Sequence, residues 1–229
     1  MPPEIRAAYA RRAAEYAEHL GSITSVHPSD LQLVTGWAER LDGSLIDAGC
    51  GPGQWTGHLA ERGVRIRGVD LVPGFIDHAR QAYPEVSFAI GDIGALPEPP
   101  GTVAGVLAWY SLIHHEPKSL RDALSEFARV LRPGGELLLG FFEGPVVEPF
   151  EHAITTAYRW PVAALSDELR AAHYDIIETH TRTGPGHRPH GAIRACLSAR
   201  ADGALVEIVA RHQSVGEWAV GAMEAPTAR

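Results

Sequence analysis

The chain has few of the features that mark extracellular, zinc-binding or membrane-spanning proteins. Its 229 residues include two cysteines, Cys50 and Cys196, too few for a disulfide framework or a zinc site. No run approaches the roughly 18 apolar residues of a membrane-spanning helix, and the first residues lack the apolar core of a signal peptide. We therefore expect a cytoplasmic protein with no membrane partner.

Positive charge is also scarce. Lys118 is the only lysine, and 20 basic residues against 28 acidic ones give a formal net charge of −8. A protein with this balance is a poor partner for nucleic acid, so we expect none. The hydrophobic content of 45% is typical of a globular domain.

From residue 44 onward, short apolar segments alternate with helical ones. The runs Leu45–Ile46, Val103–Trp109 and Leu137–Phe142 are apolar on both faces, as central strands covered by helices are. Alternating strands and helices predict a mostly parallel sheet. Two amphipathic helices are expected before this pattern, over residues 4–20 and 29–41, the second with Ser29 or Asp30 as its N-cap.

The second half of the chain is less regular. A helix is expected over residues 161–172, and the segments DIIETHT and AIRACLSA, joined by a turn-rich stretch, predict an antiparallel pair at the sheet edge. Residues 203–222 are expected to form a last helix.

The most informative segment is a glycine-rich turn after the first strand, with Gly49, Gly51 and Gly53 preceded by Asp47. Ligands of open α/β sheets bind at the carboxyl ends of strands, where glycines let the backbone approach closely. The G-x-G-x-G spacing differs from the G-x-G-x-x-G of dinucleotide folds. A carboxylate beside the turn suits a cation better than a pyrophosphate.

Two further acids follow at the next strand ends. Asp70 ends the strand Val64–Val69 and lies 21 residues after Gly49, where such an acid typically accepts hydrogen bonds from ribose hydroxyls. Asp92 and Ile93 follow the third strand and would suit the amine and the ring of an adenine. The alternatives are a helix-capping role for Asp70 and a turn role for Asp92.

The segments DAGCGPGQW, GVDLVPGFIDHAR, FAIGDIGALP and RVLRPGGELLLGFF resemble, in order, the motifs of class I S-adenosylmethionine-dependent methyltransferases. The similarity covers residues 45–142 and is closest to the small-molecule, methyltransferase type 11/25-like branch. It implies an α/β, Rossmann-like, seven-stranded sheet, mostly parallel with an antiparallel last strand, and helices on both faces. We expect one domain over 1–229, with a helical cap (1–43), a cofactor-binding half (44–142) and a substrate-side half (143–229).

The resemblance also implies S-adenosylmethionine as the cofactor and assigns residues to it. Asp47 would lie near the amino group, and the three glycines would line the methionine and ribose. Asp70, with Leu71 beside it, would hold the ribose, and Asp92 and Ile93 the adenine. Tyr9 and Tyr16 lie on a helix resembling one that closes over the cofactor in relatives, or else pack in the core.

The segment after the fourth strand reaches the same edge of the sheet. Ala108, Trp109 and Tyr110 are candidates to contact the methionine end. His114 or His115 would act as a general base or position the acceptor, because an imidazole titrates near neutral pH. The alternative is that either histidine caps the helix starting near Pro117 or bonds to backbone.

The substrate itself is less clearly indicated. An aromatic lining would suit an apolar, aromatic or polyketide-like acceptor, or would simply pack on the sheet edge; it comprises Phe141, Phe142, Phe150, His152, Tyr158, Arg159 and Trp160. A basic turn would meet an anion or only solvent; it comprises Arg182, His187, Arg188 and His190. No metal is expected, because the histidines, together with Glu116, lack the i, i+4 spacing of metal motifs.

Three functions are compatible with these patterns. The favoured one is methyl transfer from S-adenosylmethionine to oxygen, nitrogen or carbon of a small molecule. The first alternative is a nicotinamide-dependent oxidoreductase on a doubly wound fold. The second is a non-catalytic protein that binds S-adenosylmethionine.

Overall fold

The computed structural model describes residues 3–184 and 187–198 of the 229. These residues belong to one compact unit, Met1–Ser198. The helix expected over 203–222 lies outside the described residues. The assignment of the whole chain to a single domain stays a prediction.

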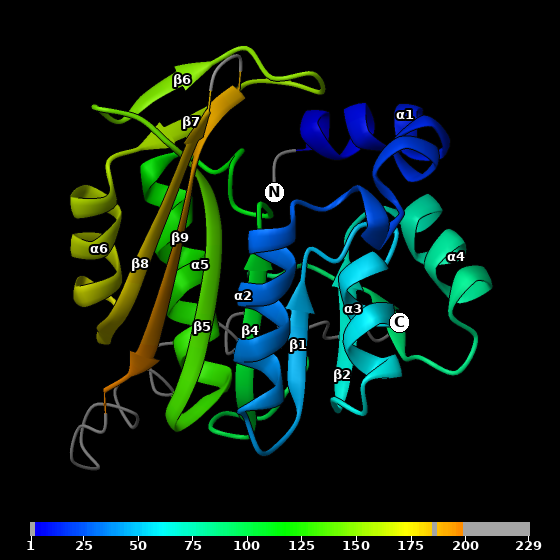
Figure 1. Cartoon of the computed structure of the whole chain (residues 1–229), viewed down its shortest axis with the longest axis horizontal. Coiled ribbons are helices and arrows are strands. Elements are labelled where there is room, and N and C mark those ends of the chain that lie inside the picture. Colours follow the sequence, from blue (N-terminus) through cyan, green and yellow to red (C-terminus); the bar gives the residue numbers. More distant parts are fainter. Residues whose placement is uncertain (1–2, 185–186, 199–229) are drawn as a thin grey trace, which may run out of the picture. The chain divides into compact units, whose positions relative to one another are not determined.

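A twisted sheet forms the centre of this unit (Figure 1). Five parallel strands run in the order β3 (Phe88–Ile90), β2 (Ile66–Asp70), β1 (Leu45–Ala48), β4 (Val103–Trp109) and β5 (Leu131–Glu143). Antiparallel β9 (His187–Leu197) pairs with β5, and β8 (Tyr174–Gly184) pairs with β9. This arrangement confirms the predicted mostly parallel sheet with its antiparallel edge pair.

Two short strands were not predicted. β6 (Glu148–Phe150) and β7 (Ala157–Trp160) arise from the segment that the sequence marks as irregular, so the sheet has nine described strands rather than seven. The physical reason lies in β5. The pairing of β4 with β5 ends at Gly140, and β7 pairs with the edge that this leaves free at Phe142 and Glu143. β9 occupies the opposite edge of β5 as far as Phe142.

Helices cover both faces of the sheet, as predicted (Figure 1). α2 (Pro28–Glu39) and α3 (Gln54–Glu61) pack with Leu45, Leu107 and Leu138. α5 (Pro117–Val130) and α6 (Val162–Ala171) pack with the alternate positions, including Ile46, Val106 and Leu137. Successive side chains of a strand point to opposite faces, so both faces of the apolar strands are buried.

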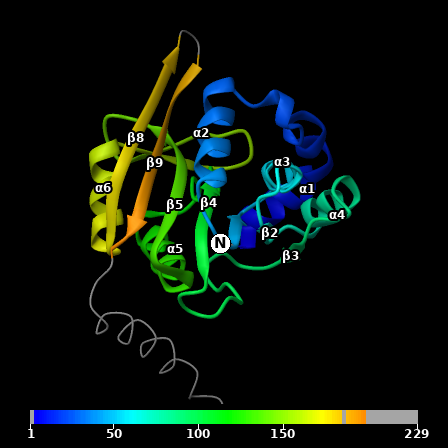
Figure 2. The same ribbon diagram turned by 60° about the horizontal axis from the view of Figure 1, so that its bottom comes forward.

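The N-terminal cap matches the expected helices with one correction. α1 (Pro3–Leu20) packs on α4 (Pro73–Ala82) (Figure 2), and the short 3-10 helix η1 (Ile23–Ser25) and α2 follow it in the chain. The N-cap of α2 is His27, not Ser29 or Asp30, and its Nδ1 accepts a hydrogen bond from the Ser29 N–H at 3.2 Å. Pro28 starts the helix earlier because its fixed φ suits the first helical position. None of the described helices is long and apolar enough to span a bilayer.

Candidate active site

The glycine turn after β1 has the backbone that its glycines were expected to allow. Gly49, Gly51 and Gly53 have φ angles of 79°, 55° and 89°. A Cβ on Gly49 would lie 2.4 Å from the Cβ of Ser111, whereas one on Gly51 would meet no atom within 4 Å. Gly49 therefore permits close packing of the turn on the segment after β4. Gly51 leaves open space at the end of β1.

Asp70 joins this turn to the end of β2. Its Oδ2 accepts a hydrogen bond from the Gly51 N–H at 2.9 Å, and its Oδ1 accepts one from the Val72 N–H at 2.8 Å. Burial raises the pKa of this carboxyl, and the backbone hydrogen bonds oppose that shift. Each carboxylate oxygen can accept a further hydrogen bond, so Asp70 remains able to bind ligand hydroxyls beside Gly51.

Asp47 lies beneath the turn and is almost completely buried, with 2% of its surface exposed. The Thr56 hydroxyl donates to its Oδ2 at 2.7 Å. Burial raises the pKa of Asp47 to about 7; the Thr56 hydrogen bond opposes this shift, and the charge of Asp70 adds to it. Two acids in such an environment are stabilised in their charged form by a cation nearby.

Two buried polar atoms near the turn have no hydrogen-bond partner among the described residues. They are Oγ of Ser111, which packs against Gly49, and Oε1 of Gln54, the first residue of α3. A buried polar atom without a partner costs on the order of 1–3 kcal/mol, which a polar ligand would offset. Neither residue was predicted from the sequence, although Gln54 directly follows the glycine turn and Ser111 directly follows Tyr110.

The other residues that were predicted to bind the cofactor differ in their burial and in their contacts. Asp92 accepts a hydrogen bond from the Gly94 N–H at 2.9 Å, which is the turn role considered as an alternative. Ile93 is 4% exposed and packs in the main core, and Leu71 is partly buried. Ala108 is fully buried in the same core, so its side chain faces no open space. Contacts of these residues with a cofactor stay predictions.

At the end of β4 the chain turns sharply. Trp109 packs edge-to-face on Trp55, with ring centroids 5.9 Å apart. Tyr110 has a φ of 58°, which is rare for a residue with a side chain. Its hydroxyl lies 2.6 Å from Nδ1 of His190, so Tyr110 points toward the β9 side rather than toward the glycine turn.

His114 lies next to Tyr9 and makes a hydrogen bond through each of its ring nitrogens. Its Nδ1–H donates to the Thr156 carbonyl oxygen at 2.7 Å, because a carbonyl can only accept. This leaves Nε2 as the acceptor for the Tyr9 hydroxyl, also at 2.7 Å. Burial lowers the pKa of His114, so the imidazole is neutral and able to take a proton at neutral pH.

His115 points elsewhere. Its Nδ1 lies 3.3 Å from the carbonyl oxygen of Ser119 at the start of α5, and its buried Nε2 has no described partner. Both histidines thus contact a backbone carbonyl through Nδ1, as the alternative given for either of them predicted. Tyr9, on α1, also packs edge-to-face on Phe75 at 6.0 Å, whereas the side chain of Tyr16 lies outside the described residues.

A group of rings adjoins His114, which we name the acceptor-side cluster: Tyr110, His114, Phe142, Phe150, His152 and His190. Phe142 is central, with ring centroids 5.2 Å from Tyr110, 5.3 Å from Phe150 and 5.7 Å from His152. The guanidinium carbons of Arg159 and Arg188 lie 4.5 and 4.8 Å from the Phe150 ring centroid. The cluster thus has an aromatic interior and a cationic border.

Comparison with known proteins shows what this geometry resembles. Residues 45–135 match the family model described as a methyltransferase domain. The segment from β1 to the start of β5 is therefore similar to methyltransferase domains. The turn, Asp47, Asp70 and Asp92 lie inside or beside the matched segment, whereas α1 and the segments of Phe150, His152 and His190 lie outside it.

One similar protein is the malonyl-[acyl-carrier protein] O-methyltransferase of Salmonella typhimurium. It is 38% identical over 133 residues, which are 57% of this chain and 50% of that protein. Demethylmenaquinone methyltransferase of Beutenbergia cavernae is 30% identical over 145 residues, 62% of this chain and 59% of that protein. The chain thus matches about half of the length of these relatives. The crystal structure of the 1,6-didemethyltoxoflavin-N1-methyltransferase of Burkholderia thailandensis has the same fold, with a TM-score of 0.70 at 20% identity, covering 86% of this chain and 91% of that one.

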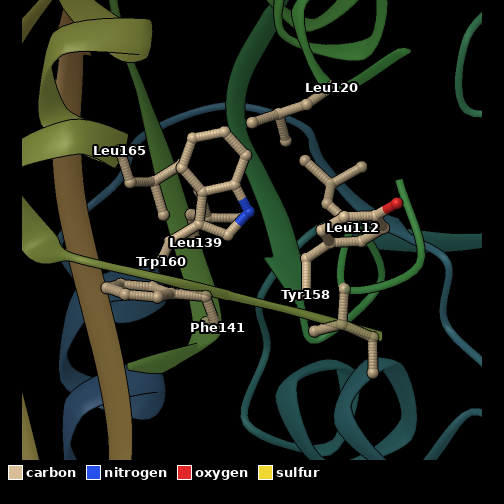
Figure 3. A pocket seen from close by; sticks show the side chains of 9 residues that line it. Leu112, Leu120, Leu139, Phe141, Tyr158, Trp160 and Leu165 are labelled. Carbon is tan, nitrogen blue, oxygen red and sulfur yellow. The ribbon is translucent and has the colours of Figure 1, made fainter. Parts of the chain in front are cut away.

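The residues of the predicted aromatic lining lie in two separate places. Phe142, Phe150 and His152 belong to the acceptor-side cluster, but Phe141 faces the other side of the sheet because neighbouring residues of a strand point to opposite faces. A small apolar pocket lies there, between β5, α5 and α6 (Figure 3). Its lining residues are Leu112, Ile113, Leu120, Leu139, Gly140, Phe141, Tyr158, Trp160 and Leu165.

Other potentially reactive groups of the chain include possible metal ligands and the Cys50 thiol. Within the described residues, no group of three histidines, cysteines or acids is placed to hold a metal ion. Cys50 is a free thiol packed with Ile76, Ala79 and Phe88, and burial raises its pKa well above the usual value, which makes it a poor nucleophile. Arg182 pairs with Asp30 at 2.8 Å, and the side chain of His187 lies outside the described residues.

Proposed function

We propose that the protein transfers the methyl group of S-adenosylmethionine to a small-molecule acceptor. The observation that carries this proposal is the Asp70 carboxylate, held 2.9 Å from the Gly51 N–H where a missing side chain leaves open space. An acid and a free backbone at adjoining strand ends suit a nucleoside with two ribose hydroxyls. The two free cysteines are consistent with a reducing, cytoplasmic setting.

The residues around the turn fit the other parts of this cofactor. Asp47 and Asp70 would balance its positive charge, and the unpartnered oxygens of Ser111 and Gln54 would meet the polar groups of its methionine end. Asp92 and Ile93 would lie toward the adenine. The bound cofactor supplies a methyl group on a positively charged sulfur.

The protein's own groups would prepare the acceptor. His114, fixed by Thr156, would take the acceptor's proton on Nε2. The Tyr9 hydroxyl donates to that nitrogen, so its oxygen can accept a hydrogen bond from the acceptor and relay the proton. The rings of the acceptor-side cluster would exclude water, which favours a step in which a positive charge disappears.

Binding and turnover measurements test this function and its alternatives. S-adenosylmethionine and its demethylated product, S-adenosylhomocysteine, should bind, whereas NAD should not compete with either. Saturation of the same site by NAD would favour the oxidoreductase. Tight binding without transfer of a labelled methyl group to any member of a panel of phenols, acids, amines and carbon nucleophiles would favour a non-catalytic binding protein.

A further inference from the structure

The acceptor-side cluster contains a buried ring nitrogen that lacks a hydrogen-bond partner among the described residues. That nitrogen is Nδ1 of His152. The His152 ring centroid lies 5.5 Å from that of His114 and 5.7 Å from that of Phe142. The unpartnered nitrogen is therefore close both to the proposed base and to the aromatic rings. A polar group of a ligand placed between them would satisfy it.

The charges around the cluster select against a cation. Burial lowers the pKa of His152 to about 4, with His114 and the positive charge of Arg188 also lowering it. The ring is therefore neutral at neutral pH. Of the two nearby cations, Arg159 is partly balanced by Glu148, whose Oε1 lies 3.6 Å from its Nη1, whereas Arg188 adds positive charge at the Phe150 ring. On the Tyr110 side, Asp30 and Arg182 form an ion pair at 2.8 Å, so their charges largely cancel.

The ring contacts of the cluster favour an aromatic ligand. Phe142 makes edge-to-face or tilted contacts with Tyr110, Phe150, His152 and His190 at 5.2–5.7 Å. Aromatic rings prefer such neighbours in offset or edge-to-face arrangements. An aromatic acceptor would extend this packing, whereas a flexible aliphatic chain would lose more conformational freedom on binding.

We propose, building on the proposed function, that the acceptor is a planar aromatic compound methylated on a hydroxyl group. The hydroxyl oxygen would lie between the Tyr9–His114 pair and Nδ1 of His152, with the ring against Phe142. The hydroxyl proton passes to Nε2 of His114 and the new O–C bond forms as the S–C bond breaks. The sulfur keeps that electron pair and leaves as a neutral thioether.

Calorimetry with two probes of similar shape tests this assignment. 2-Naphthol and the cation 2-naphthylmethylammonium are titrated into the protein saturated with S-adenosylhomocysteine. The naphthol should bind at least tenfold more tightly than the cation, and labelled S-adenosylmethionine should yield 2-methoxynaphthalene. Equal or tighter binding of the cation, or no binding of the naphthol, would overturn the proposal.

A variant pair locates the effect at His152. His152→Phe keeps an aromatic ring but removes the nitrogen, so it should weaken naphthol binding at least fivefold and leave S-adenosylhomocysteine binding unchanged. His78→Phe, at an exposed position on α4, should change neither. Unchanged naphthol binding by His152→Phe would refute the role of its nitrogen. Failure of S-adenosylhomocysteine to bind the wild-type protein would instead refute the proposed function.

Discussion

The hydroxyl of Tyr9 lies 2.7 Å from Nε2 of His114, although 105 residues separate them in the chain. This contact links the N-terminal helix to the segment after β4, and the Thr156 carbonyl fixes the ring from its other side. A tyrosine predicted as a cofactor residue thus contacts the proposed base. Kinetics of substituted proteins can separate the two histidines that the sequence left equivalent.

His114→Gln should lower kcat by about 10²–10⁴-fold, the usual contribution of a general base, without changing the Kd of S-adenosylhomocysteine. His115→Gln should lower kcat much less, because His115 faces α5. Tyr9→Phe should give an intermediate loss. Steady-state kinetics with an identified acceptor measure all three. A larger loss in His115→Gln than in His114→Gln would reverse the assignment.

The glycine turn offers a matched pair of substitutions. Gly51 and Gly63 have φ angles of 55° and 84°, and a Cβ on either would meet nothing within 4 Å. Alanine at each should therefore cost a similar amount, about 1–2 kcal/mol of folding free energy, from left-handed backbone alone. Only Gly51→Ala should weaken S-adenosylhomocysteine binding, by at least tenfold. Comparable binding by the two variants would show that no ligand approaches Gly51.

Asp47 should couple cofactor binding to pH. Its pKa of about 7 lies above the ordinary value of 3.8, so the folded protein binds more protons than the unfolded chain between these values. The protonated Asp47 carboxyl therefore contributes fully to the stability of the folded protein below about pH 4, and this contribution is lost as the pH rises through 7. A cation bound nearby favours the ionised form, so S-adenosylmethionine should bind more tightly as pH rises from 6 to 8.

Calorimetry in buffers of different ionisation enthalpy measures that linkage. Binding of S-adenosylmethionine near pH 6.5 should release a fraction of a proton, and Asp47→Asn should abolish the release. Proton uptake, or a release that persists in Asp47→Asn, would contradict the role of this carboxyl.

A buried ion pair below the site supports the fold. Glu126 is 2% exposed; its Oε1 accepts from the Leu96 N–H and from Arg129 Nη2, both at 2.6 Å. Glu126→Ala should lower the free energy of unfolding by about 3–5 kcal/mol, since it leaves a largely buried arginine unpaired. Asp167→Ala, which removes an exposed partner of Arg170, should cost less than about 1 kcal/mol. Chemical denaturation compares the two, and equal losses would contradict this account.

The sequence predicted the fold where local pattern determines structure. Apolar runs bounded by glycine and proline gave β1, β4 and the helices after them, and the antiparallel edge pair followed from two extended segments around a turn. The strands β6 and β7 were missed because their pairing depends on the end of β5, a tertiary relation. The early start of α2 at Pro28 was missed because the cap is a histidine ring rather than a usual capping side chain.

The same contrast between local and tertiary features applies to the candidate site. The glycine turn and Asp70 each lie at the end of a predicted strand, so their spacing in the sequence was enough to predict that they lie close together. The partnership of Tyr9, His114 and Thr156 joins three distant segments, and no spacing in the sequence encodes it. Phe141 and Phe142 were predicted to line one site, although the two-residue period of a strand places adjacent side chains on opposite faces.

The central claim is that Asp70 holds the ribose of a nucleoside bound against Gly51. Titration of S-adenosylhomocysteine into the wild-type protein and into Asp70→Asn tests it most directly. The substitution removes the charge but keeps the size, and it should weaken binding by about 2–4 kcal/mol, as expected for lost charge-assisted hydrogen bonds. An unchanged Kd in a variant with unchanged thermal stability would contradict the claim.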